Sequence, residues 1–373
     1  MVKGLLRVIA PLVVLVLALP ALAAGSRAAL PKVVVVDTTV DAADTSPADG
    51  VCSAKVFASG GKHCTLRAAV QTVNAGKRGA YLISVPEGTF RLTAVGMFED
   101  KAAKGDLDIT QADVAIVGKG AGKTIVDGNA LDRVFDVSAF AQLRLVGLRV
   151  HGGKLVDSGS GGGGINVRGG LVLDNVYVDR NVASQVGGGL RVDSTGSVEI
   201  KSSTLAYNQA SIGGAAAIYG SASFVNTSIL SNTADNSGNV AVWGKASLAH
   251  ATVAYNKALS PSQVTAVGVF KGGKATIASS IVLGSCFLYW GDHFPYPQHN
   301  VVTSPSCADD PPVSKPGLSF ITKSATGLPV VALKSTSPAV DVVPVAGCPS
   351  VDERGLARPQ GAACDAGAYE LPK

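Results

Sequence analysis

The stretch Ala222-Ser-Phe-Val-Asn-Thr-Ser-Ile-Leu-Ser-Asn232 decides the fold of this chain, because similar stretches precede and follow it. Each copy ends in Asn, at positions 181, 208, 232 and 256, so that the copies are spaced by 27, 24 and 24 residues. Self-similarity at such a period indicates stacked structural units. The other copies are Leu171-Val-Leu-Asp-Asn-Val-Tyr-Val-Asp-Arg-Asn181, Val198-Glu-Ile-Lys-Ser-Ser-Thr-Leu-Ala-Tyr-Asn208 and Ala246-Ser-Leu-Ala-His-Ala-Thr-Val-Ala-Tyr-Asn256.

Two repeat architectures have this period, the leucine-rich repeat and the parallel β-helix. Leucine-rich repeats need a dense Leu pattern and a helix-forming half, whereas these copies alternate β-branched residues with Ser, Thr and Asn. Glycine runs at Gly161–Gly164, Gly187–Gly189 and Gly213-Gly214 lie between the copies, each followed by a short apolar segment. Glycine accepts the positive φ of tight turns, so each run is expected to feed a short strand. The pattern therefore predicts an all-β chain wound as a parallel β-helix.

The recurring Asn has a physical role in such a coil. Equivalent residues of successive coils lie about 4.8 Å apart, which lets stacked amides donate and accept along a ladder. The short Asn side chain also tolerates the left-handed conformation, which is expected at these positions. A second polar row, six residues earlier, is expected to stack inside the adjacent turn, and a ligand-binding stripe is the alternative. That row comprises Asn175, Ser202, Asn226, His250 and Ser279.

The first 23 residues have the features of a secretory signal peptide. Lys3 and Arg7 precede an apolar run, and small residues before Ala24 suit cleavage. An uncleaved anchor is the alternative, although the run is short for a membrane span. Without the two basic residues, 30 of the 32 Lys and Arg remain against 27 acids, a mild excess that gives no indication of a nucleic-acid partner. No later stretch is long and apolar enough to predict a transmembrane helix.

Six cysteines remain in the exported part, an even number that indicates disulfides in an oxidising compartment. They lie in neighbouring pairs along the sequence, so we predict three bridges; a zinc site is the alternative, but no closely spaced Cys pair supports it. All lie outside residues 65–285, which must hold together without bridges. The predicted bridges are Cys52–Cys64, Cys286–Cys307 and Cys348–Cys364.

The sequence divides into four parts. Residues 1–23 form the signal peptide, 24–82 an N-terminal cap, 83–285 the coils and 286–373 an irregular C-terminal segment packed on them. In the cap, a helix is expected from Thr65 to Ala75, with Thr65 as N-cap and Gly76 as the stop. Its apolar residues Leu66, Ala69, Val70 and Val73 fall on one face and would close the open end of the solenoid.

Both ends of the chain resemble a known pattern. Cys64-Thr-Leu-Arg-Ala-Ala69 resembles the Cys-Ser-Leu-Arg-Glu-Ala (CSLREA) motif of exported bacterial proteins, with Thr65 in place of Ser and Ala68 in place of Glu. The stretch Gly105-Asp-Leu-Asp-Ile109 is similar to sequence that usually follows this motif. The tail, from Ser337-Pro-Ala-Val-Asp341 to Cys364-Asp-Ala-Gly-Ala-Tyr-Glu370, resembles a choice-of-anchor Q domain. The resemblance implies a right-handed, pectate-lyase-like β-helix that is secreted or surface-associated, and it supplies no catalytic residues.

Such β-helices include polysaccharide lyases and glycoside hydrolases, so the resemblance also admits a catalytic function. From Lys201 through Gly291 the sequence has one carboxylate, Asp235, which excludes an acid pair in the later coils. Asp174 and Lys201 occupy equivalent positions of adjacent coils and are the candidate acid and base; a surface ion pair is the alternative.

Other polar residues are expected to be structural. Asp106 and Asp108 lie on one face of a strand and are expected to hydrogen-bond a turn rather than bind a metal, and His151 is expected in the core or a turn. No metal or cofactor is predicted.

A binding role is the other possibility. Arg180, Tyr207 and Tyr255 share one repeat position, directly before the Asn ladder, and could contact a sugar on successive coils; packing at the turn is the alternative. We therefore expect a glycan- or surface-contacting, adhesin-like module without conventional catalysis, whose partner is an extracellular polysaccharide or cell-surface glycan. A polysaccharide lyase or glycoside hydrolase acting on an anionic polysaccharide is the alternative.

Overall fold

A computed structural model describes residues 30–56, 61–97, 99–156, 161–260, 265–289, 299–308 and 310–373. The chain divides into two compact units, Met1–Leu30 and Pro31–Lys373, and the second is described below. The predicted signal peptide lies outside the described residues. Within the described part, no helix is long and apolar enough to cross a membrane.

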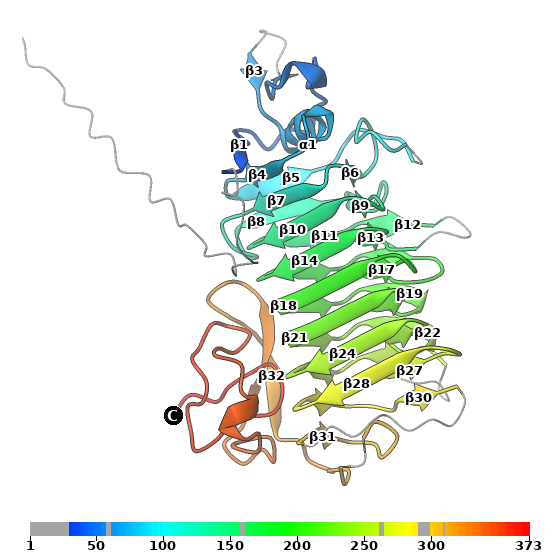
Figure 1. The fold of residues 1–373 in the computed structure, drawn as a ribbon. Helices are drawn as coiled ribbons and strands as arrows, with labels where there is room; N and C mark the ends of the chain where they lie inside the picture. Colours follow the sequence, from blue (N-terminus) through cyan, green and yellow to red (C-terminus); the bar gives the residue numbers. More distant parts are fainter. Residues whose placement is uncertain are drawn as a thin grey trace, which may run out of the picture. The chain divides into compact units, whose positions relative to one another are not determined.

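The second unit is a right-handed parallel β-helix, as the repeat predicts (Figure 1). One coil consists of β14 (Gly170–Asp174), β15 (Tyr177–Asp179), β16 (Val182–Ala183) and β17 (Leu190–Val192). Each of these strands pairs in parallel with the equivalent strand of the next coil. The coil therefore has three main faces, named here the first, second and third after β14, β15 and β17, and a short sheet that contains β16.

The remaining strands extend these four stacks in register. β18 (Ser197–Ala206) and β21 (Ser221–Leu230) continue from the first face into the second. The first face also holds β1 (Lys32–Val35), β4 (Ala80–Ser84), β7 (Asp113–Val117), β10 (Gln142–Val146), β24 (Lys245–Ala249) and β28 (Lys274–Ala278). The second holds β5 (Gly88–Arg91), β8 (Thr124–Asp127), β11 (Arg149–His151), β25 (Thr252–Ala254), β29 (Ile281–Val282) and β31 (Val301–Val302).

The third face and the short sheet complete the coils. The third face holds β6 (Leu107–Ile109), β9 (Phe135–Val137), β13 (Ile165–Val167), β20 (Ala216–Ile218), β23 (Val240–Val242), β27 (Val267–Val269) and β30 (Phe287–Leu288). The short sheet holds β12 (Lys154–Leu155), β19 (Gln209–Ile212), β22 (Thr233–Ser237) and β26 (Lys257–Ala258). Strand pairing thus extends beyond residues 83–285 at both ends, through β1 and β31.

The Asn ladder forms as predicted. Each side-chain amide donates to the Asn Oδ1 of the next coil, over distances of 3.0 Å from Asn181 to Asn208, 3.0 Å from Asn208 to Asn232 and 3.1 Å from Asn232 to Asn256. The first three amides are fully buried, where an unpaired amide would be costly. The ladder therefore stabilises the middle coils, which lack disulfides.

The backbone conformation predicted for the ladder is wrong by one position. The left-handed residues are those directly before each Asn, with φ of 53° at Arg180, 58° at Tyr207 and 60° at Tyr255. Their backbone turns outward, so that the following amide reaches the interior.

The second polar row is also left-handed, and its predicted place inside the turn is wrong. The residues that follow it, such as Thr227, point inward and are fully buried. The row itself points outward, and the C-terminal segment covers part of it. Asn226 Nδ2 donates to Val351 O at 2.7 Å, and His250 Nε2 lies 3.0 Å from Gly347 O.

The N-terminal cap follows the prediction closely. Helix α1 (Leu66–Ala75) begins after Thr65, whose side chain accepts a hydrogen bond from Ala68 N at 3.0 Å, and ends at Gly76. Its predicted apolar face is buried in the main core with β4 and β6. The short antiparallel pair β2 (Ala54–Lys55) and β3 (Lys62–His63) and a single 3₁₀ turn at Pro47–Asp49 precede the helix.

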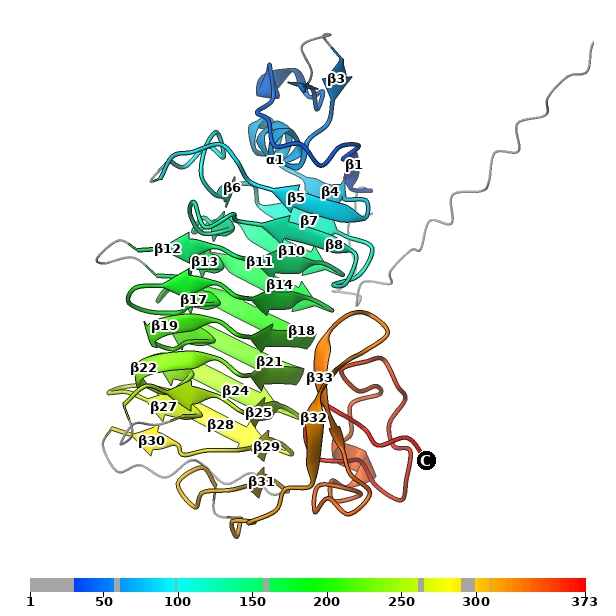
Figure 2. The ribbon, with the colours of Figure 1, turned by 180° about the vertical axis from the view of Figure 1, so that it is seen from behind.

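The C-terminal segment packs along the second face (Figure 2). Its antiparallel hairpin, β32 (Leu318–Lys323) and β33 (Pro329–Leu333), lies beside β18 and β21. Irregular chain and a 3₁₀ turn at Val345–Gly347 follow it. All three predicted disulfides form: Cys52–Cys64, Cys286–Cys307 and Cys348–Cys364.

Candidate functional site

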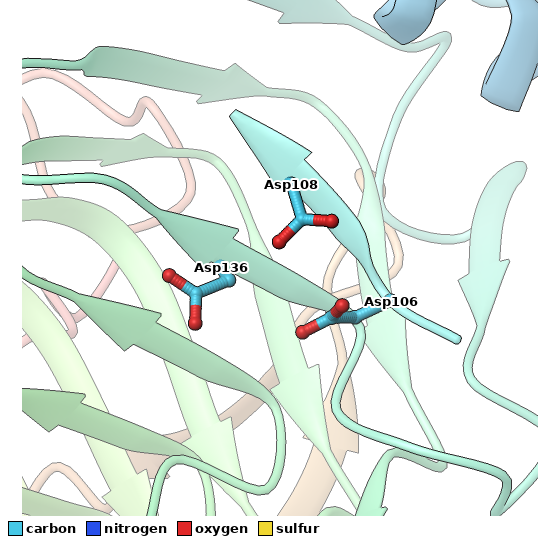
Figure 3. A group of neighbouring side chains, drawn as sticks. All are labelled: Asp106, Asp108 and Asp136. Atoms are coloured by element: carbon cyan, nitrogen blue, oxygen red, sulfur yellow. The ribbon is translucent and has the colours of Figure 1, made fainter. Parts of the chain in front are cut away.

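Three buried carboxylates converge on the third face, near its N-terminal end (Figure 3). Asp108 lies on β6 and is the register partner of Asp136 on β9, while Asp106 directly precedes β6. Each offers an oxygen within 4.8 Å of the oxygens of the other two. They line a cavity of about 260 Å³, named here the acid cavity, which also contains Asn166 of β13 and Arg191 of β17.

The cap helix holds the loop that carries these acids. Arg67 is fully buried and pairs with Asp41 at 2.7 Å, while its guanidinium donates to the carbonyls of Ala102, Gly105 and Asp106. Gly105 has a φ of 60°, and a Cβ there would lie 2.2 Å from Gly96 O. Arg67 and Gly105 together therefore fix the loop that leads into Asp106.

Two arginines partly neutralise the cluster. Arg133 Nε lies 2.7 Å from Asp106 and its Nη1 lies 3.2 Å from Asp136, yet Nε makes no directed hydrogen bond. Arg168 Nη2 donates to Asp136 at 2.8 Å. Asn166 Nδ2 donates to Asp136 Oδ2 at 3.3 Å, and its buried Oδ1 has no hydrogen-bond partner.

Burial strongly favours the protonated forms of two of these acids. Desolvation, with the charge of Asp108 next in importance, raises the pKa of Asp106 to about 9. Desolvation likewise raises the pKa of Asp108 to about 7, although the hydrogen bond from Ala102 N opposes it. The Asp108 bond to Ala102 N, at 2.7 Å, is the turn interaction expected from the sequence. The convergence with Asp136 was not expected, because Asp136 is distant in the sequence.

A second cavity lies between the second face and the C-terminal hairpin. It has a volume of about 540 Å³, and Arg149, Tyr177, Arg180 and Tyr207 line it on the solenoid side. The hairpin supplies the other wall, including Lys323. The described residues that line it include three cationic side chains and no carboxylate. We name it the cationic groove.

The positive charge of the groove is unevenly compensated. Arg149 forms two hydrogen bonds of 2.6 Å with Asp179, which is fully buried beneath it. Arg180 lies 3.6 Å from the same Asp179 and its side chain is 65% exposed. The Arg180 guanidinium also lies 5.6 Å from the centre of the Tyr207 ring, and Tyr207 is 41% exposed. Arg180 and Tyr207 are therefore the accessible side chains of the solenoid wall, and Lys323 is exposed on the hairpin wall.

The structure separates the three residues that were predicted to contact a sugar on successive coils. Arg180 and Tyr207 share the groove, but Tyr255 instead donates its hydroxyl to Ser319 O at 2.9 Å. Tyr255 thus contacts the hairpin through its hydroxyl, while 39% of the residue stays exposed.

The two predicted catalytic residues are neighbours but form no ion pair with each other. Asp174 and Lys201 are register partners on β14 and β18. Asp174 lies 2.8 Å from Arg144 and Lys201 lies 2.7 Å from Glu199, so each charge is taken up by a different neighbour.

The position predicted for His151 is wrong. It lies on β11, within the second face, and its Nδ1 is 3.2 Å from Asp179 Oδ1. It packs beside Arg149 on the outside of the strand rather than in the core or a turn.

An aromatic stack on the third face was missed. Tyr219, Trp243 and Phe270 each directly follow a strand of this face, and their rings stack with centroids 4.5 and 4.2 Å apart. The signal in the sequence was their recurrence after the short apolar segments that follow the glycine runs. Neighbouring rings cover one another, so the stack adds aromatic packing between successive coils.

Comparisons with known proteins give a fold likeness. No family model matches the chain, and no curated protein matches it. The chain is similar to a solved structure described as the crystal structure of pectate lyase Pel9A, with 13% identity over 80% of this chain and 90% of that chain. The TM-score is 0.35, so this likeness carries no argument about activity.

Proposed function

We propose that this protein is a secreted, adhesin-like glycan-contacting module that binds an anionic polysaccharide in the cationic groove. The groove carries the proposal, because the described residues that line it include three cationic side chains and no carboxylate. Guanidinium groups form paired hydrogen bonds with carboxylates and sulfates. The exposed Tyr207 ring offers an apolar surface against which a sugar ring can pack.

Three further features support this proposal. The three disulfides are typical of proteins from oxidising compartments. The resemblance of residues 64–69 to the CSLREA motif, and of the tail to a choice-of-anchor Q domain, indicates export. The solenoid repeats equivalent positions along its axis, which suits a partner that is itself a repeating polymer.

Affinity electrophoresis with polygalacturonate and alginate, against neutral dextran, tests this function. We expect retardation by the acidic polymers that weakens with added salt, because exposed charges are screened. Replacing Arg180 and Tyr207 together by Ala should weaken binding by tenfold or more. Lys245→Ala is the matched control, because Lys245 is an exposed cation on β24 of the first face.

Three results would contradict the proposal: equal retardation by dextran, unchanged binding by the double variant, or equal weakening by the Lys245 control. Ultraviolet absorbance of the same mixtures tests the alternative function. A steady rise from unsaturated sugar products would establish a lyase in place of a binding module.

A further inference from the structure

We propose that the acid cavity binds a divalent cation, Ca²⁺, through the carboxylates of Asp106, Asp108 and Asp136 and the amide oxygen of Asn166. Oxygen ligands lie about 2.4 Å from Ca²⁺, so any two of them are at most about 4.8 Å apart. The three carboxylates meet this condition, since their oxygens lie within 4.8 Å of one another. This site goes beyond the proposed glycan binding and does not depend on it.

Asn166 provides the independent indication of a ligand. Its side chain is 6% exposed and lines the cavity beside the acids. The amide nitrogen donates to Asp136, and Oδ1 is buried without a hydrogen-bond donor among the residues that the structure describes. A cation between Asn166 and the carboxylates would satisfy this oxygen.

The strand register brings the proposed Ca²⁺ ligands together. Asp108, Asp136 and Asn166 are successive register partners on β6, β9 and β13, so their outward side chains are stacked at the spacing of the sheet. Asp106 joins them from the loop that Arg67 holds. The four ligands therefore lie on a rigid framework, which lowers the ordering cost of binding an ion.

Acidic side chains outnumber basic ones around the cavity, and a bound cation would stabilise their ionised forms. The described residues that line it include six acids and three arginines: Glu99, Asp100, Asp106, Asp108, Asp136 and Asp193, and Arg133, Arg168 and Arg191. Arg133 approaches Asp106 and Asp136 without a directed hydrogen bond from Nε, so it neutralises the cluster only in part. Carboxylate and amide oxygens suit Ca²⁺, which accepts irregular geometry and water as further ligands, better than Mg²⁺, which demands near-ideal octahedral geometry.

Calorimetric titration of the chelator-treated protein with CaCl₂ tests the site. We expect one Ca²⁺ per chain, a higher melting temperature with Ca²⁺, and weaker binding of Mg²⁺. Asp108→Asn and Asp136→Asn should each weaken Ca²⁺ binding by tenfold or more. Asp174→Asn is the matched control, because Asp174 pairs with Arg144 on the first face and should leave Ca²⁺ binding unchanged.

The Asn166→Asp variant tests whether Asn166 is a ligand of the ion or only a structural amide. A fourth carboxylate should tighten Ca²⁺ binding and enlarge the rise in melting temperature, while lowering the melting temperature in chelator. A purely structural amide would lower the melting temperature equally with and without Ca²⁺, which would overturn the proposal. No Ca²⁺ uptake by the wild-type protein, or unchanged uptake by both Asp variants, would also overturn it, and these results remain decisive if one variant fails to fold.

Discussion

The acid cavity and the cationic groove are built in the same way but carry opposite charge. In both, outward side chains of successive coils stack in register, from Asp108 to Asn166 in one and from Arg180 to Tyr207 in the other. In both, a segment outside the repeat supplies the remaining wall. The cap helix holds the loop over the acid cavity, and the C-terminal hairpin closes the groove. The repeats thus supply most of the functional side chains of each site, and segments outside the repeat complete its walls.

The largest expected effect comes from removing the support of the acid cavity. Arg67→Ala leaves the buried Asp41 carboxylate without its ion-pair partner and removes the donors to three backbone carbonyls, so we expect a loss of about 3–5 kcal/mol in the free energy of unfolding. Denaturant unfolding measures this loss. Ca²⁺ binding should disappear, whereas retardation by polygalacturonate should persist in the folded fraction.

Arg91→Ala is the control for this variant. Arg91 also pairs with an Asp, at 3.1 Å from Asp127, but its side chain is 61% exposed, so its loss should cost less than about 1 kcal/mol. A similar loss of stability in both variants, or a loss of glycan binding by the Arg67 variant, would show that the two sites are not supported separately.

The second largest expected effect is a pH dependence of the free energy of unfolding, which originates at the wall of the groove. Glu353 is buried between the tail and the second face, where Thr204 Oγ1 lies 2.8 Å from its carboxyl and 2.9 Å from Pro329 O. Thr204 has one hydroxyl hydrogen for these two acceptors, so a protonated Glu353 that donates to Thr204 completes the network. Desolvation accordingly raises the pKa of Glu353 from 4.5 to about 8.

The sign of the pH dependence follows from this shift. Between about pH 4.5 and 8 the folded state retains a proton that the unfolded state has lost, so the free energy of unfolding falls as pH rises, by a few kcal/mol in total. Glu353→Gln replaces the protonated carboxyl with a neutral group of the same shape. The stability of the variant relative to wild type should therefore increase with pH.

Comparing the two proteins at each pH isolates Glu353 from other titrating groups. His250 also contacts the tail, and burial lowers its pKa to about 4, but its contribution is present in both proteins and cancels. Urea unfolding at several pH values provides the measurement. A difference in stability that stays constant with pH would show that Glu353 is ionised in the folded state.

The sequence predicts the repetitive parts of this molecule better than its sites. The Asn ladder could be found because one residue type recurs at one position, and the helix because Thr65 and Gly76 mark its ends. The left-handed conformation was predicted at the Asn residues but occurs one position earlier. The sequence gives no sign of this, because the conformation depends on how the Asn side chain is directed, and Arg180 and Tyr207 are not residues that favour positive φ. The acid cavity needs the register between Asp108 and Asp136, and the groove needs a wall more than a hundred residues from Tyr207, neither of which a local pattern contains.

The smallest expected effect compares Tyr207 with Tyr255, two residues at the same repeat position with φ of 58° and 60°. Tyr207 lines the groove, whereas the Tyr255 hydroxyl donates to Ser319 O in the hairpin. Tyr255→Phe should lose one partly exposed hydrogen bond, about 1 kcal/mol of stability, and leave glycan binding unchanged. Tyr207→Phe should change neither quantity, because the ring rather than the hydroxyl is expected to contact the sugar.

Tyr207→Ala completes this comparison, since it removes the ring that lies beside the Arg180 guanidinium. We expect glycan binding to weaken by up to about tenfold, equivalent to about 1.4 kcal/mol, with little change in unfolding. Affinity electrophoresis and denaturant unfolding of the same three variants measure both quantities. If Tyr255→Phe weakens binding as much as Tyr207→Ala does, the binding surface extends along the whole column, and the groove is one part of a longer contact with the polymer.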